Sequence, residues 1–109
     1  MYFCDGIIGG ENEGPIDPSP INMGIIIGGF DPLMVDLAIA ELMNFDFKRI
    51  PQIKNIFNLK NRKISNHQPN DLKIFSNNTN WNEKKISEVL NSIKFNPSSG
   101  WKNYIEKKN

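Results

Sequence analysis

A continuous apolar run that leads directly into a helix start is the feature that most constrains this chain. Residues 23–29 are uncharged, rich in isoleucine and bounded by glycines, which is typical of a strand covered on both faces. Asp31 and Pro32 follow, and these residue types favour the N-cap and the first turn of a helix. The helix is expected over residues 32–43, where only Asp36 and Glu41 interrupt the apolar residues. The sequence therefore predicts a buried strand followed by a buried helix.

Four further elements are expected, each from a short local pattern. They are a strand at 2–8, a helix at 51–58, a strand at 72–75 and a helix at 80–93. The last of these begins at Asn80, because Asn80 and Glu83 have the spacing of a capping box. It is expected to bury the apolar residues Trp81, Ile86, Val89, Leu90 and Ile93.

This order of elements predicts one α/β domain over residues 1–94. It has a small sheet, a buried central helix and two or three further helices, and an acidic loop rich in glycine and proline at 9–22. If the strands at 23–29 and 72–75 pair in parallel, the central helix forms a right-handed crossover between them. Residues 95–109 are predicted to be a turn-rich tail that docks back onto the domain, with a frayed end.

Charge separates the two halves of the chain. Residues 1–47 hold eight acidic residues and no lysine or arginine, whereas residues 48–109 hold all 13 basic residues and four acidic ones. We expect these halves to neutralise each other within the fold or between subunits. The basic residues are scattered and the overall charge is only +1, so a nucleic-acid partner is not expected.

The compartment is expected to be the cytoplasm, because a single cysteine, Cys4, allows no internal disulfide. No apolar run approaches the roughly 18–20 residues that a membrane span needs. We therefore expect no membrane partner.

Three carboxylates are the candidate ligand or metal residues. Glu11 and Glu13 lie in the acidic loop and offer the hard oxygen ligands that Mg²⁺ and Ca²⁺ prefer; the alternative is a solvated acidic loop. Asp36 lies in the apolar helix, where a buried carboxylate must be paired, hydrogen-bonded or protonated. The alternative for Asp36 is a structural role at the positive start of the helix. No metal site is assigned.

For the remaining candidate residues, no catalytic or ligand-binding role is expected. Gly28 and Gly29 are expected to form a tight strand-to-helix turn, and no nucleotide site is expected there because the phosphate-binding motifs are absent. His67 is expected to face solvent, and Cys4 to be a small buried hydrophobe. No nucleophile and base can be placed together from the sequence, so no reaction is assigned and enzyme activity is left open.

Four segments in order resemble the carboxy-terminal part of proteins in domain of unknown function family 362. They are DGIIGGENEGP at 5–15, GGFDPLMVD at 28–36, LMNFD at 42–46 and PSSGWKNYIE at 97–106. The last segment is similar to the end of a branch found near bacterial surface-glycan gene clusters. The sequence departs from the family pattern at Asn12, Glu13, Met34 and Asn44.

The resemblance implies that the chain is the C-terminal, non-catalytic portion of a larger α/β protein that binds a cofactor or ligand. The missing N-terminal portion would be its partner, with Glu11 and Asp36 near their shared cleft. Many family members carry ferredoxin-like iron–sulfur modules, which need several cysteine thiolates. With one cysteine we expect this chain to bind no cofactor alone, so a cluster is expected only in the upstream region. The alternative is a free-standing module for protein interaction or self-association, covered by a partner chain or a second copy.

Overall fold

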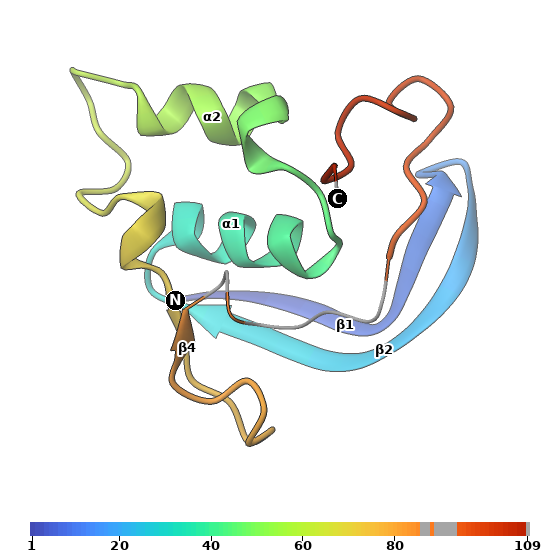
Figure 1. Cartoon of the computed structure of the whole chain (residues 1–109), viewed down its shortest axis with the longest axis horizontal. Coiled ribbons are helices and arrows are strands. Elements are labelled where there is room, and N and C mark those ends of the chain that lie inside the picture. The colour runs from blue at the N-terminus through green and yellow to red at the C-terminus, as the bar shows by residue number, and fades with distance from the viewer. Residues whose placement is uncertain (86–87, 89–93, 109) are drawn as a thin grey trace.

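The computed structural model describes residues 1–85, 88 and 94–108 of the chain. A long antiparallel hairpin of β1 (Tyr2–Glu13) and β2 (Asp17–Gly29) forms one layer. The helix α1 (Pro32–Leu42) lies across one face of this hairpin (Figure 1).

The other elements are short. Helix α2 (Pro51–Phe57) lies on the side of α1 away from the hairpin (Figure 1). A second antiparallel pair joins β3 (Lys73–Ile74) to β4 (Lys84–Lys85). Two single 3₁₀ turns complete the described elements, η1 (Phe47–Arg49) and η2 (Pro69–Asp71). The predicted α/β class, the helix at 51–58 and the strand at 72–75 are therefore confirmed.

The hairpin extends through the segment that was expected to be a loop. The strands include most of residues 9–22, and only residues 14–16 form the turn. The loop prediction is wrong because both strands of a two-stranded ribbon have an outer edge, where a proline costs no ladder hydrogen bond. Pro18 lies opposite Asn12, whose N–H points away from β2 and donates to the Asn96 carbonyl over 2.8 Å. Asn12 and Pro18 therefore form a non-hydrogen-bonded pair of the antiparallel ladder, in which Pro18 needs no N–H.

The strand at 23–29 is covered on one face rather than two. Alternate residues of β2 are half-buried and exposed, with Ile27 on the side that α1 covers and Ile26 on the other. The predicted parallel crossover is also wrong, because Ile27 pairs with Cys4 of β1 and both sheets are antiparallel. A 13-residue strand that returns directly along its predecessor needs only a tight turn, whereas a parallel pair needs a long connection.

Local signals determine both ends of α1. The Asp31 carboxylate accepts hydrogen bonds from the N–H groups of Leu33 and Met34 over 3.0 and 3.3 Å. Asn44, just beyond the helix, has a φ of 64°, the left-handed conformation that commonly ends helices and that asparagine tolerates. The predicted helix start and stop are therefore confirmed.

The core forms three clusters around α1 and the segments that follow it. One packs Leu33 and Ala40 of α1 against Ile53 of α2, and a second packs Leu37 and Ala38 against Leu72. The third lies beyond the end of α1 and gathers Phe45, Phe95 and Ile105. Leu37 has no exposed surface, so the described part of the chain packs around α1. Asp36, however, is exposed, and α1 is therefore not enclosed on all sides.

The predicted helix at 80–93 does not begin where the capping box indicated. Residues 81–83 form a turn, Glu83 has a φ of 59°, and Lys84 pairs with Ile74 in an extended conformation. A left-handed Glu83 cannot occupy the third position of a helix, so the prediction is wrong at its start. Trp81 is half-buried in this turn. The rest of the predicted helix, except for Glu88, lies outside the described residues.

Candidate functional site

The two glutamates of the predicted acidic loop hold the C-terminal tail. Glu11 Oε2 accepts hydrogen bonds from the backbone N–H of Asn96 over 2.8 Å and from its side-chain amide over 3.0 Å. Glu13 Oε1 accepts from the Ser99 N–H over 2.8 Å. Both carboxylates therefore have structural partners in the tail.

Asp36 lies apart from these glutamates. It is in the second turn of α1, the helix that follows the open end of the hairpin, whereas Glu11 and Glu13 lie near the hairpin turn. Its side chain is exposed rather than buried, so the expectation of a desolvated carboxylate is wrong. The apolar residues of α1 cover more than half of its circumference, but the hairpin and α2 leave a strip of the helix open to solvent. In the part of the chain that the structure describes, no three histidine, cysteine, aspartate or glutamate residues group to hold a metal ion.

The tail is attached at the connection between α1 and α2 as well. The Arg49 guanidinium donates to the Tyr104 carbonyl over 2.9 Å, and the Asp46 N–H donates to the Ile105 carbonyl over 2.7 Å. The Lys107 ammonium pairs with the nearly buried carboxylate of Glu41. Acidic residues of the N-terminal half thus meet groups of the C-terminal half within one molecule.

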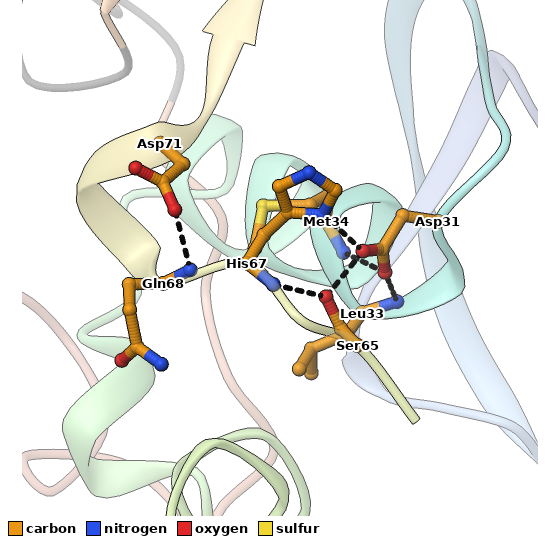
Figure 2. A network of polar contacts seen from close by, with 7 residues as sticks. All are labelled: Asp31, Leu33, Met34, Ser65, His67, Gln68 and Asp71. Carbon is orange, nitrogen blue, oxygen red and sulfur yellow. Dashed lines mark hydrogen bonds and ion pairs between the residues drawn. The ribbon is translucent and has the colours of Figure 1, made fainter. Parts of the chain in front are cut away.

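A polar network that the sequence did not indicate joins Asp31 to Ser65 and His67 (Figure 2). Asp31 Oδ2 accepts from the Ser65 hydroxyl and lies 3.0 Å from His67 Nδ1, while its Oδ1 caps α1. The Ser65 hydroxyl also accepts from the His67 N–H over 3.0 Å. One carboxylate therefore caps a helix and anchors the segment between α2 and β3.

The surroundings of Asp31 favour its charged form. Partial burial raises the pKa of this carboxyl, but hydrogen bonds from Ser65, from His67 and from the backbone of Met34 and Leu33 outweigh burial and bring the pKa below its usual value. The carboxylate is therefore ionised wherever the protein is folded at ordinary pH.

The three residue types match those of a hydrolase triad, but their connections differ. In a triad the histidine lies between the other two groups and takes the serine proton. Here the Ser65 hydroxyl donates to Asp31, and the imidazole contacts the same carboxylate through Nδ1. This arrangement directs the serine proton to Asp31 rather than to His67 and does not activate the hydroxyl as a nucleophile. The His67 side chain is 61% exposed, in line with its predicted contact with solvent.

Gly28 and Gly29 make room on opposite faces of the hairpin. A Cβ added at Gly29 would lie 2.8 Å from Val35 Cγ2, so this glycine allows α1 to approach β2. A Cβ added at Gly28 would lie 2.9 Å from the Phe3 ring, which covers Gly28 from the other face. Gly28 and Gly29 therefore allow close packing on the two faces of the hairpin. The remaining small candidate, Cys4, is half-buried in β1.

The face of the hairpin opposite α1 carries large exposed apolar side chains. We call this surface the outer face and define it by Phe3, Ile8 and Ile26, together with the exposed Phe30 at the bend that follows β2. Phe3 is 69% exposed, Ile26 68% and Phe30 82%.

Comparison with protein-family models, with curated proteins and with solved structures finds no match to this chain. Within the described ranges, no helix has the length and apolar character needed to cross a membrane.

Proposed function

We propose that this chain is a non-catalytic interaction domain whose outer face packs against further polypeptide. The observation that carries the proposal is the exposure of Phe3, Ile8 and Ile26 on one face of one hairpin, next to the exposed Phe30 that follows β2. Single apolar residues are common on protein surfaces, but a group on one face marks an interaction surface. Complete burial of each of these side chains contributes about 1.5–3 kcal/mol, so covering the face is strongly favourable.

The architecture of the hairpin supports the same role. An isolated two-stranded hairpin is only marginally stable, and stable sheets gain a third strand or a second packed layer. Helix α1 packs on one face of β1 and β2. Polypeptide that covers the outer face would turn the domain into the three-layered α/β arrangement of a larger fold.

Two sources of that polypeptide fit the proposal. Further residues of a longer chain would make this domain the C-terminal portion of a larger cofactor- or ligand-binding protein, as the family resemblance implies. A separate chain would make it a free-standing interaction module. The contacts of Glu11 and Glu13 with the tail favour a structural role for both residues in either case.

A dye that fluoresces on apolar surfaces tests the proposal. The Ile26→Ser, Phe30→Ser double variant should bind less dye, because it removes two large side chains from the outer face. Its free energy of unfolding should stay within about 0.5 kcal/mol of the wild-type value, as for other exposed positions. The matched control is Leu59→Ser, Ile64→Ser, in a segment that connects α2 to η2.

The control should leave dye fluorescence close to that of the wild type. Unchanged fluorescence in the hairpin variant would contradict the proposal, since the outer face would then not be the apolar surface that the dye detects. A loss of stability above about 2 kcal/mol would also contradict it, because losses of that size are typical of core positions.

A further inference from the structure

The second edge of β2 carries backbone groups that lack a partner among the described residues. Residues 25–29 pair with β1 along one edge of the strand. On the other edge, alternate residues direct N–H and C=O groups outward, and no hydrogen bond from another described residue reaches them. This edge is therefore available to a further strand.

Charged residues and prolines, which often protect such an edge, are absent from residues 25–29 of β2. Natural edge strands carry lysines, prolines, bulges or inward-pointing charges that prevent pairing with other chains. No charged residue occurs from Pro18 to Phe30, and the prolines of β2 are confined to positions 18 and 20. The bulge of the hairpin lies in β2, where Met23 and Gly24 lie opposite the single residue Ile7 and Gly24 has a φ of 65°. Beyond this bulge, residues 25–29 form a regular, apolar edge that includes the exposed Ile26.

We propose that a second copy of this chain pairs with β2 along this edge, antiparallel and about a twofold axis, to form a four-stranded sheet. This inference goes beyond the proposed function, because edge pairing extends the sheet in its plane beside the outer face rather than covering it. Backbone hydrogen bonds supply the pairing, as in other cases of strand addition. Contact between Ile26 and its counterpart across the axis supplies the side-chain packing.

The charge distribution suits an identical strand as the partner. The paired segment is uncharged, so two copies meet without opposed like charges, whereas a charged strand would bury an unpaired group. Antiparallel pairing also sends the two acidic turns, each with Glu13 and Asp17, to opposite ends of the joined sheet. Parallel pairing would instead place these turns side by side. The net charge of +1 adds little repulsion between whole molecules.

Sedimentation over a range of concentrations tests the proposal with the full chain. The wild type should associate to a dimer, and Ile26→Lys should weaken association at least about tenfold, because two lysines would lie near the twofold axis. Ile16→Lys is the matched control: Ile16 is 94% exposed in the hairpin turn, outside the proposed pairing segment. It should dimerise like the wild type. Reducing agent keeps Cys4 from cross-linking two copies.

Two further measurements keep the result interpretable. Ile26→Thr removes the apolar contact but keeps a β-branched residue suited to strands, so it should also weaken dimerisation if Ile26→Lys fails to fold. Amide hydrogen exchange should show slower exchange at residues 25–29 as concentration rises, with no such change at the hairpin turn. Protection confined to other segments would overturn edge pairing.

A chain that stays monomeric to about 1 mM, the weak end of measurable affinities, would also overturn it. The dye experiment separates this failure from failure of the proposed function. A monomer whose outer face still binds dye refutes only self-pairing, whereas a monomer whose dye binding is unaffected by the hairpin variant refutes both.

Discussion

Replacing Asp31 by alanine removes two structural contacts at once, because one carboxylate oxygen caps α1 and the other anchors Ser65 and His67. Loss of an N-cap side chain costs about 1 kcal/mol. Loss of the Ser65 hydrogen bond costs about another 1 kcal/mol in this half-buried setting. The contact with His67 adds at most a few tenths of a kcal/mol, because its side chain is 61% exposed and exposed pairs contribute little. The expected loss is about 2 kcal/mol.

Urea unfolding followed by circular dichroism measures this loss directly. The Asp31→Ala variant should have a lower midpoint at an unchanged slope, since the surface exposed on unfolding is the same. The matched control is Asp36→Ala, the same change on the same helix at an exposed position. Alanine suits a helix interior better than aspartate, so the control should lose no stability. Equal losses in the two variants would refute the structural role of Asp31.

Asp31→Asn separates the two functions of the carboxylate. Asparagine caps helices about as well as aspartate, but its single carbonyl oxygen cannot replace both carboxylate oxygens. The variant should therefore lose about 1 kcal/mol, the part that belongs to the Ser65 anchor. Adding Ser65→Ala to Asp31→Asn should then cost little more, because coupled residues are not additive. Fully additive losses would show that Asp31 and Ser65 act independently.

The pH dependence follows from the direction of the shift at Asp31. Its pKa in the folded protein lies below the usual value near 3.8, so the unfolded chain binds the proton more tightly. The contribution of the carboxylate is therefore complete above about pH 4 and is lost as the pH falls through the folded pKa. The wild type should lose this contribution to its free energy of unfolding in acid. Asp31→Asn should lack the contribution at every pH. A difference between the wild type and Asp31→Asn that stays constant as the pH falls below 4 would contradict the shift.

Four more variants test the packing and the attachment of the tail. Leu37→Ala should cost about 3 kcal/mol, because Leu37 has no exposed surface and its loss leaves a cavity; an unfolding curve that shows less than about 1 kcal/mol would place Leu37 outside the core. Gly29→Ala should cost about 1–3 kcal/mol, as overpacking does, because the new Cβ meets Val35 at 2.8 Å. Gly28→Ala should cost less, since an exposed ring can move aside, and the reverse order in thermal unfolding would argue against this packing. Glu11→Ala should speed amide exchange at residues 95–99, where the tail loses two hydrogen bonds, and unchanged exchange there would show that the tail needs no such contact.

The elements that could be predicted are those whose signals are local. Asp31 and Pro32 at the start of α1, and Asn44 after its end, act through hydrogen bonds and backbone conformations within a few residues. The same holds for α2, which begins at Pro51. Such signals operate in any fold, so the sequence alone is enough to predict them.

The errors all concern positions where partners distant in the sequence decide the structure. Pro18 looked like a loop residue, but its place at the edge of a two-stranded ribbon costs no hydrogen bond. Glu83 has the spacing of a capping box, yet pairing of Lys84 with Ile74 keeps the chain out of a helix there. Asp36 looked buried because its neighbours are apolar, and the packing of α1 leaves it exposed.

The candidate site shows the same difference between what local sequence signals predict and what only the folded structure decides. The sequence determined which residues carry charge, where α1 begins and where apolar surface accumulates along the chain. Only the tertiary structure decided that Ser65 and His67 meet Asp31, and that Glu11 holds Asn96. These contacts join residues 34 to 85 positions apart, and such pairs leave no periodic or local pattern in the sequence. The outer face is exposed for the same reason, because it is the position of α1 on one side of the hairpin that leaves Ile26 and Phe30 in water.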